Sequence, residues 1–464
     1  MASIVSSGIG SGLDIAGIVQ SLVAAEGQPV DARITQQEAR AQAKLSAFGS
    51  LKSALADLRD KLDIMKSLDK FLTRKASSGN EDYFTVSAGT NALPASYDLE
   101  VVQIAQSQKL TSGAFADSAT VVGTGTLTLG LGASTVDIEI TAENNTLAGI
   151  RDAINADSSN PGVAATIVNA DSGSYLILTS EETGAAQTIT VTQTGGDGGL
   201  SALEYDPGAG LTSLTESIAP QDALIRIDGF DVMSDTNTFT GAVEGVTISV
   251  VQSSSGAAEK LLVENDEEAA RALIGDFVES YNTLIDIFDG LTNYNAEEDV
   301  GSPLLGDATI RSVRDQIRRE LSIAVKDIDA PFSVLRDVGI EAQLNGKLEI
   351  NDDEMSTILA DDFVKFGQLF ANSDGFAVRL HELTDGFLKT DGIIETRTKG
   401  LEEKIDGFGD DREALNERLA SLETRLLRQF NALDSLLAQL SSTSNFLAQQ
   451  LTNLPGVTNS GGNG

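Results

Sequence analysis

The sequence predicts an α+β protein of several domains: a coiled-coil-like helical leg built from both chain ends, and a β-rich head formed by the middle of the chain. Leucines recur every seven residues near the C-terminus, apolar residues recur at helical spacing after residue 34, and alternating or β-branched runs fill residues 82–264. These periodicities separate helices from half-buried strands. The 464 residues suffice for about three domains.

Composition excludes several classes of function. The chain has 32 Lys and Arg against 69 Asp and Glu, a formal net charge of −37. Such a charge argues against sequence-independent nucleic-acid binding and against docking on anionic membranes. The absence of Cys and the single His, His381, remove thiol nucleophiles, Cys-based metal sites and His pairs. We therefore expect no metal, no cofactor and a structural protein rather than an enzyme.

Residues 1–33 form a predicted N-terminal segment without a targeting signal, so we expect a chain that is either cytosolic or exported by a route that reads no cleavable signal. The first basic residue is Arg33, whereas a secretory signal peptide needs a positive region before its apolar stretch. Glycines interrupt the apolar stretch, so we expect no membrane span. The run from Gly8 to Gly12 resembles a phosphate loop, but no strand precedes it and no Gly-Lys-Ser/Thr follows.

Residues 34–81 are predicted to contain the N-terminal leg helix, from Ile34 to Leu68. Pro29 precedes this range and fits the start of a helix, where proline is tolerated. Steps of three and four residues define its apolar stripe. The stripe consists of Ile34, Ala41, Leu45, Phe48, Leu51, Leu55, Leu58, Leu62 and Met65.

Residues 82–264 are predicted to form the β-rich head, with two subdomains. Gly, Asn, Asp and Ser separate the strand-like runs, as turns require. These runs are 84–87, 97–104, 136–140, 163–168, 175–179, 188–192, 224–227 and 246–251, and one amphipathic helix carries Leu147, Ile150 and Ile154. Residues 81–261 hold 4 basic and 23 acidic residues. A solvated acidic surface explains this charge, and a calcium site, the alternative, would need an acidic loop motif that is absent.

Residues 265–400 are predicted to be a mixed leg domain. Asn265 and Glu268 suggest a capping box for a helix that begins at Asp266. Further helices are expected at 309–325 and 355–370, and Asn345-Gly346 predicts a type I′ turn between strands 340–344 and 347–350. His381 is expected to be a surface or boundary residue on a helix; a lone catalytic base is the alternative.

Residues 401–464 carry the sharpest periodicity. The heptad leucines are Leu419, Leu426, Leu433, Leu440 and Leu447. They predict a coiled-coil seam of about 42 Å, with an ordinary long bundle helix as the alternative. The partner predicted for this seam is the helix 34–68, so that Ile34, Phe48, Leu55 and Leu62 face these leucines.

Several motifs resemble one family. Gly8-Ile9-Gly10-Ser11-Gly12-Leu13-Asp14-Ile15, followed by Ile18-Val19, resembles the N-terminal signature of the bacterial flagellar filament-capping proteins, the hook-associated protein 2 family. Tyr281-Asn282, Gly339-Ile340, Gly346-Lys347-Leu348, Gly392-Ile393-Ile394 and Gln429-Phe430 agree in order with its C-terminal half, and residues 143–192 resemble the flagellin IN motif. The resemblance covers nearly the whole chain.

The resemblance implies a non-enzymatic cap at the distal end of the flagellar filament. Such caps are rings of about four to six copies that promote insertion of exported flagellin, and a chaperone binds the C-terminal helix before export. The implied location is the extracellular tip of the flagellum, reached without a cleavable signal peptide. Ile9, Leu13, Ile15 and Val19 are the expected grip on the filament. Two alternatives remain: another flagellar axial protein, such as a hook–filament junction protein or a flagellin, and a secreted enzyme or adhesin.

Overall fold

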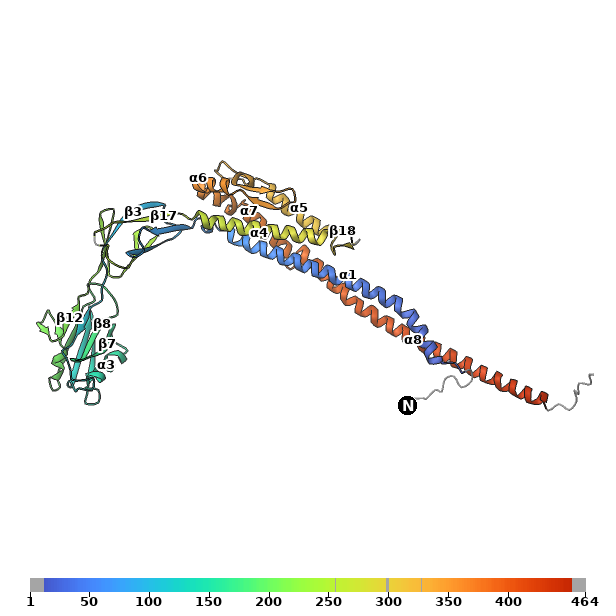
Figure 1. Cartoon of the computed structure of the whole chain (residues 1–464), viewed down its shortest axis with the longest axis horizontal. Helices are drawn as coiled ribbons and strands as arrows, with labels where there is room; N and C mark the ends of the chain where they lie inside the picture. The colour runs from blue at the N-terminus through green and yellow to red at the C-terminus, as the bar shows by residue number, and fades with distance from the viewer. Residues whose placement is uncertain (1–11, 255, 298–299, 327, 453–464) are drawn as a thin grey trace, which may run out of the picture. The chain divides into compact units, whose positions relative to one another are not determined.

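The computed structural model describes residues 12–254, 256–297, 300–326 and 328–452, and these divide into two compact units. The helical unit combines the described parts of residues 1–67, 273–358 and 368–464. The β unit comprises residues 68–272 with a short return at 359–367. Both chain ends therefore build the helical unit and the middle of the chain builds the β unit, as the sequence predicts (Figure 1).

Six long helices account for most of the helical unit. They are α1 (Ile15–Met65), α4 (Glu267–Thr292), α5 (Ala308–Ser322), α6 (Asp352–Ala371), α7 (Phe376–Leu388) and α8 (Ile393–Thr452); the start of α4 and the middle of α6 belong to the β unit. Short elements connect them: β18 (Tyr294–Asn295), β19 (Val300–Gly301), the 3-10 helix η2 (Leu335–Val338), β20 (Ile340–Ala342) and β21 (Leu348–Ile350).

The first helix begins much earlier than predicted. The Asp14 side chain accepts a hydrogen bond from Gly17 N at 3.0 Å and so provides the N-cap of α1. Pro29, which was predicted to precede the helix, lies inside it. A proline within a helix removes one hydrogen bond and bends the axis, and α1 bends in its N-terminal part (Figure 1).

The predicted leg helix also extends too far at its C-terminal end. The helix ends at Met65, and a short helix α2 (Leu68–Phe71) and strand β1 (Arg74–Ser78) occupy most of the remaining range to residue 81. This chain segment becomes a strand because β1 pairs antiparallel with β17 (Glu259–Asn265), a partner distant in sequence. Local periodicity carries no information about such a partner.

The other helices of the helical unit lie close to their predicted ranges, with two local corrections. Asp266, not Asn265, is the N-cap of α4, since its Oδ1 accepts a hydrogen bond from Ala269 N at 2.9 Å. The hairpin of β20 and β21 exists, but its turn is not type I′. Gly346 N donates to Gln343 O, and among the described residues of this turn only Gly346 has a positive φ, of 86°. Asn345 is therefore in a type I turn, followed by a glycine bulge.

Two hydrophobic cores organise the β unit. The first lies between the sheets β1-β17-β3-β13-β14 and β15-β16-β2, and includes Phe84, Leu99 and Ile248. Its remaining strands are β2 (Phe84–Ala88), β3 (Ala95–Gln103), β13 (Ala223–Ile227), β14 (Phe230–Ser234), β15 (Thr238–Val243) and β16 (Val246–Val250). Two stretches of the chain build this module, and in the sequence they flank the stretch that forms the second core.

The second core lies in the stretch between those strands. Helix α3 (Leu147–Ala156) turns Leu147, Ile150 and Ile154 into it, and all three are fully buried, as predicted. The sheets are β11-β10-β9-β5-β6 and β12-β4-β8-β7. Their strands are β4 (Lys109–Thr111), β5 (Gly125–Leu131), β6 (Ser134–Ile140), β7 (Val163–Ala170), β8 (Gly173–Ser180), β9 (Ile189–Thr194), β10 (Tyr205–Asp206), β11 (Leu211–Thr212) and β12 (Thr215–Ile218), with a 3-10 helix η1 (Gly199–Leu203).

All eight predicted strand-like runs overlap strands, but other strands of the β unit were not predicted. The missed strand β17 is central to its sheet, between β1 and β3, and it buries Leu261 and Val263. Lys260 and Glu264 interrupt its apolar pattern from the outer face, and Glu259 is a charged residue at the start of the inner face. Pairing in the sheet outweighs the weak local signal.

Candidate interaction surfaces of the helical unit

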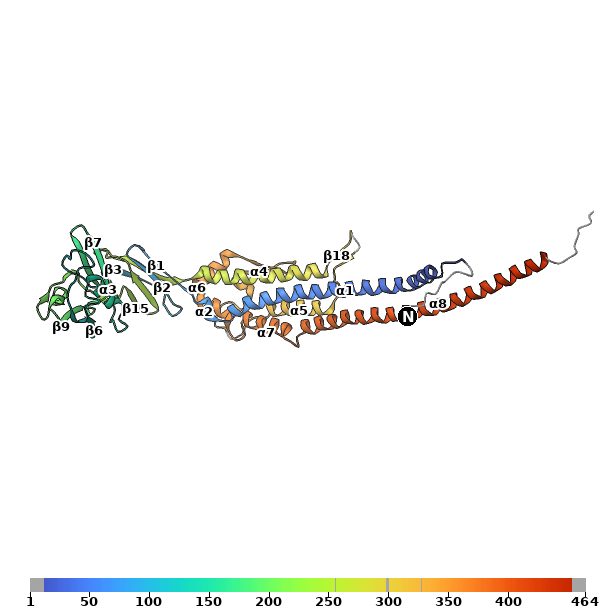
Figure 2. The same cartoon turned by 90° about the horizontal axis from the view of Figure 1, so that it is seen from below.

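Helices α1 and α8 lie side by side in opposite directions (Figure 2). Two ion pairs show which residues of the helices lie at the same level. Lys52 Nζ lies 2.6 Å from Glu395, and Arg418 Nη2 lies 3.3 Å from Glu26. As the chain number rises along α8 it falls along α1, so the two chain ends form one antiparallel helix pair. Exposed ion pairs add little stability, so burial of apolar side chains holds the pair together.

The buried contact between the two helices is a small apolar cluster. Ile34 and Ala41 of α1 pack with Phe408 and Leu415 of α8, and none of the four is more than 8% exposed. On α8 the buried row continues towards the N-terminus at Leu401 and Ile394. The steps from 394 to 401, 408 and 415 are seven residues each, which is the spacing of a coiled-coil seam.

This register corrects the predicted pairing. Ile34 meets Phe408 and Leu415, while Leu419 lies against Gly27, where an added Cβ would come within 2.7 Å of Leu419 Cδ1. Phe48, Leu55 and Leu62 are fully buried, but they lie beyond the level of residue 412 and cannot face Leu419–Leu447. The antiparallel direction, which a heptad pattern does not reveal, sets this register.

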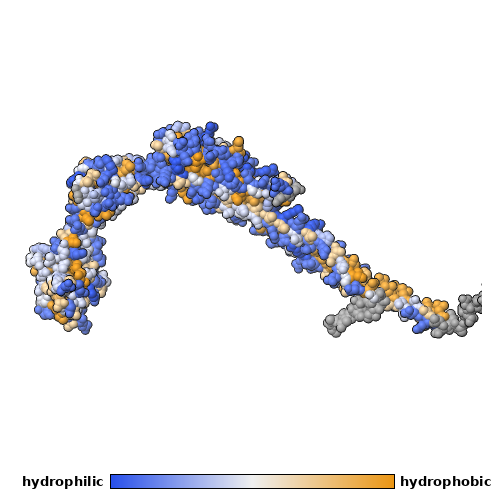
Figure 3. Space-filling model, viewed as in Figure 1, coloured by the Kyte–Doolittle hydropathy of each residue, from blue (hydrophilic) through white to orange (hydrophobic). Residues whose placement is uncertain are grey.

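The C-terminal part of α8 extends past α1 and exposes its apolar row. Leu426 is half-buried, whereas Leu433, Leu440 and Leu447 are 49%, 58% and 55% exposed. Leu436, Leu437, Phe446 and Leu451 are exposed beside them. Figure 3 shows apolar surface along this end of the helix. We call these seven side chains, from Leu433 to Leu451, the exposed α8 face.

The described residues of the predicted N-terminal contact with the filament differ in exposure. Ile9 lies outside the described residues. Leu13 is 50% exposed just before α1, while Ile15 and Val19 are buried in the helical unit. Of the described three, only Leu13 presents an apolar side chain to a partner in this conformation, and a filament-contacting role for the group stays a prediction.

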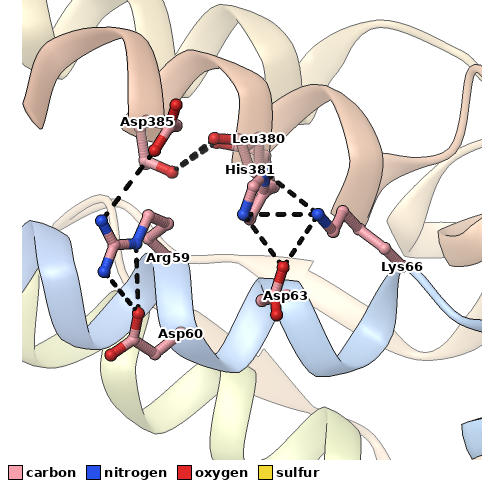
Figure 4. A network of polar contacts seen from close by, with 8 residues as sticks. Arg59, Asp60, Asp63, Lys66, Leu380, His381 and Asp385 are labelled. Carbon is pink, nitrogen blue, oxygen red and sulfur yellow. Dashed lines mark hydrogen bonds and ion pairs between the residues drawn. The ribbon is translucent and has the colours of Figure 1, made fainter. Parts of the chain in front are cut away.

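Polar contacts join α1 to α7 further along the helix (Figure 4). Asp63 Oδ1 lies 2.8 Å from Lys66 Nζ and 3.2 Å from His381 Nε2. The hydrogen bond from Lys66 lowers the pKa of Asp63, and the charges of His381 and Arg59 act in the same direction. His381 is a half-buried boundary residue, as expected. Its described neighbours in this network are charged groups, which suits a polar contact between helices.

Tyr281 and Asn282 of α4 hold the β20–β21 hairpin. Tyr281 donates from its hydroxyl to Gly346 O at 3.0 Å, and burial raises the pKa of Tyr281. Asn282 donates to Leu348 O and accepts from Leu348 N, both at 2.8 Å. The side-chain amide thus takes the place of a neighbouring strand at the edge of β21.

The upstream half of the α8 seam was not among the predicted residues. Ile394, Leu401 and Phe408 continue the spacing of Leu415 backwards by sevens, so the same heptad rule could have found them. Heptad spacing alone does not tell which half of α8 is covered by other parts of the chain.

The described residues contain no group of three or more His, Cys, Asp or Glu side chains arranged to bind a metal ion. No described helix is both long and apolar enough for a membrane span.

Comparisons with known proteins agree along the whole chain. The family model for the flagellar hook-associated protein 2 N-terminus matches residues 11–108, and the model for its C-terminus matches residues 220–442. Between them, the flagellin hook IN motif matches residues 120–182, earlier than the expected 143–192.

Individual relatives give the same result. The A-type flagellar hook-associated protein 2 of Pseudomonas aeruginosa is 34% identical, over 97% of this chain and 98% of that protein. The flagellar hook-associated protein 2 of Escherichia coli K12 is 32% identical, over 98% of this chain and 99% of that protein. A crystal structure of the D1-D2-D3 domains of the Escherichia coli flagellar cap protein FliD superposes with a TM-score of 0.65 at 31% identity, covering 77% of this chain and 99% of that chain.

Proposed function

Since this chain belongs to the flagellar hook-associated protein 2 family, we propose that it forms the cap at the distal end of the bacterial flagellar filament and works there as an oligomeric ring. The ring of about four to six copies promotes insertion of exported flagellin beneath it. The protein reaches this extracellular position by export without a cleavable signal peptide. Its role is structural, and binding and release of protein surfaces take the place of catalysis.

The exposed α8 face is the observation that carries this proposal. Seven large apolar side chains from Leu433 to Leu451 lie on one helix without a covering element among the described residues. A contiguous apolar surface of this kind marks a site for another protein. Its heptad spacing suits a partner helix, from flagellin at the filament end or from a neighbouring copy.

The same face explains the need for a chaperone. Before assembly these leucines would be exposed in the cytoplasm, where apolar helices aggregate or bind nonspecifically. A chaperone with an apolar helical groove would cover them and release them at export. We propose that chaperone and assembly partners use this face in turn, so that binding of one excludes the other.

A complementation experiment tests the cap function. The host is a bacterial strain that lacks its own filament cap, which we expect to release flagellin into the medium instead of assembling it. Expression of this full chain, with its cognate flagellin, should restore filaments and swimming and reduce soluble flagellin in the medium. Secretion of the chain without recovery of filaments would overturn the proposal, since export alone would then be intact.

A further inference from the structure

A basic groove runs along the α1–α8 pair of this strongly acidic chain. One part has a volume of about 820 Å³ and is lined by Arg40 and Lys44 of α1 and by Arg397 and Lys404 of α8. A second part continues from the shared residue Gln37 and adds Arg33 and Arg418. The groove also contains two carboxylates, Asp391 and Asp411. Six cations against two anions reverse the balance of the chain as a whole.

Most of these cations are not neutralised within the chain. Arg397 pairs with Asp307 and Arg418 pairs with Glu26. Among the described residues, Arg33, Arg40, Lys44 and Lys404 form no ion pair, although Lys404 lies over the ring of Phe408. With 69 acidic residues in the chain, four unpaired cations around one groove leave a site of positive potential for an anionic partner.

The outer side of α8 carries the opposite charge. Its exposed carboxylates are Glu402, Glu403, Asp406, Asp410, Glu413 and Glu417. Within the described part of the chain none of these six has an ion-pair partner, and none lines the groove. Lys399 is the one basic residue among them on this side. The same helix therefore contributes to a cationic groove on one side and presents an acidic face on the other.

We propose that the groove of one copy receives the acidic face of α8 from a neighbouring copy, and that this contact repeats around the ring. The inference rests on the proposed oligomeric cap and names the surfaces that join its helical units. A contact between two different patches is heterologous, and a heterologous contact generates a closed ring when the rotation between copies closes.

The positions of the two patches along the helices support a ring. The groove extends along α8 from Ile393 to Arg418, and the carboxylates extend from Glu402 to Glu417. Both patches occupy the same stretch of one helix pair. Copies related by rotation about an axis parallel to these helices, without a shift along it, would bring groove and face to the same level. A helical polymer with a large axial step would separate them.

Glycine at the wall of the groove provides a second, independent indication. Gly400 lines the groove inside α8, where glycine destabilises a helix relative to alanine. Outside its own helical turn, a Cβ at Gly400 would meet no atom of this chain within 4 Å, and the same holds for Gly407, one heptad later. Packing inside the chain therefore does not require these glycines. The open space beside them suits close approach of a helix from another copy.

Charge reversal gives a test with a built-in rescue. The groove variant carries Arg40→Glu, Lys44→Glu and Lys404→Glu, and the face variant carries Glu403→Lys, Asp410→Lys and Glu417→Lys. Each variant alone places like charges in contact, so self-association should weaken by about tenfold or more and filaments should not be restored in the cap-deficient strain. Mixed together, the acidic groove of one variant meets the basic face of the other, and association should return.

The mixture separates this inference from the cap function. Recovery of filaments on co-expression, with neither variant active alone, supports the groove contact and shows that both variants are exported. Filaments restored by either variant alone would overturn the inference while leaving the cap function intact. One chain that carries all six reversals restores opposite charges at every contact of a ring with any number of copies, and its failure to assemble, although folded and secreted, would also overturn the inference. A matched control with Arg311→Glu, Arg319→Glu and Arg336→Glu makes the same charge change outside the groove and should behave as wild type.

A steric variant tests the same contact without altering charge. Gly400→Gln places a long side chain in the groove, where nothing in the chain obstructs it, and improves helix propensity. Helicity by circular dichroism should stay the same or rise while self-association falls about tenfold. Gly49→Gln, on an exposed part of α1 with equally open space, is the control that should associate normally. Normal association of the Gly400→Gln protein would contradict a close helix contact.

Discussion

The two halves of α8 have the same sequence period but opposite surroundings. In the first half, Ile394, Leu401, Phe408 and Leu415 recur by sevens and are buried. In the second half, Leu433, Leu440 and Leu447 also recur by sevens and are about half exposed. The first row is covered by elements of the same chain, with α1 over Phe408 and Leu415. The second row has no such cover among the described residues.

This difference separates folding from assembly within one helix. Burial of an apolar side chain within the chain contributes to the free energy of unfolding. An exposed side chain contributes nothing until a partner covers it, and then it contributes to binding. The first half of α8 should therefore respond to mutation by losing stability, and the second half by losing assembly.

The largest expected effect is on assembly. Leu433→Asp introduces a charge into the exposed α8 face and should reduce filament formation in the cap-deficient strain to the level of the strain without a cap. The β unit should stay folded. The unfolding free energy should change by no more than about 0.5 kcal/mol, because the Leu433 side chain is exposed in the single chain. Filament counts and a urea unfolding curve provide the two measurements.

A matched control distinguishes the α8 face from any exposed leucine. Leu344, in the turn of the β20–β21 hairpin, is fully exposed, so Leu344→Asp makes the same chemical change outside α8. It should assemble as wild type. If Leu433→Asp still formed normal filaments, the second half of α8 would have to be an ordinary solvated helix end.

The next effect is on stability. Phe408→Ala removes a ring that is 5% exposed and packed against Ile34, and it should lower the unfolding free energy of the helical unit by about 3–5 kcal/mol. Leu440→Ala, with the same heptad spacing in the other half, should lower it by less than about 0.5 kcal/mol. Equal losses from the two substitutions would show that both halves are covered in the free chain.

The sequence predicted the elements of this fold better than their partners. The heptad leucines, the apolar stripe from Ile34 to Met65 and the alternating runs identified both helices and the β-rich middle. They did so because local period reflects which side of an element is buried. The same reasoning could not provide the register of α1 against α8, since a heptad fits any partner in either direction.

Predictions from single residues or short motifs were also wrong where tertiary contacts determine the local structure. Pro29 suggested a helix start, but packing along α8 compensates for a proline within α1. Asn345-Gly346 suggested a type I′ turn, but the hairpin holds a type I turn with a bulge at Gly346. The charged strand β17 was invisible because its neighbours in the sheet, not its own residues, make it a strand. The groove required both helices in register, so no single segment of sequence could reveal it.

An internal polar contact should give an intermediate effect. Asn282→Ala removes both hydrogen bonds to the backbone of Leu348 and should destabilise the helical unit by about 1–3 kcal/mol, because a partly buried strand edge then loses its partner. Hydrogen exchange of the Leu348 amide should accelerate. Asn282→Asp, which keeps the acceptor for Leu348 N but loses the donor, should fall between wild type and Asn282→Ala; if it matched wild type, the amide donor would be unimportant.

The smallest effect compares a paired with an unpaired carboxylate of the helical unit. Asp374 accepts from Lys326 N at 2.9 Å, and this hydrogen bond, helped by the charge of Arg379, lowers the pKa of Asp374 below its ordinary value of 3.8. A carboxylate with a lowered pKa in the folded state stabilises the fold above its unfolded pKa, and this contribution is lost as the pH falls through the folded pKa. Asp374→Asn should therefore cost about 0.5–1 kcal/mol at pH 7, with the difference from wild type shrinking below about pH 4. Glu403→Gln, at an exposed carboxylate without an ion-pair partner among the described residues, is the control and should leave the unfolding free energy within about 0.5 kcal/mol of wild type. Unfolding curves between pH 7 and pH 2 measure both, and parallel curves for wild type and Asp374→Asn would show that the bond to Lys326 contributes nothing in solution.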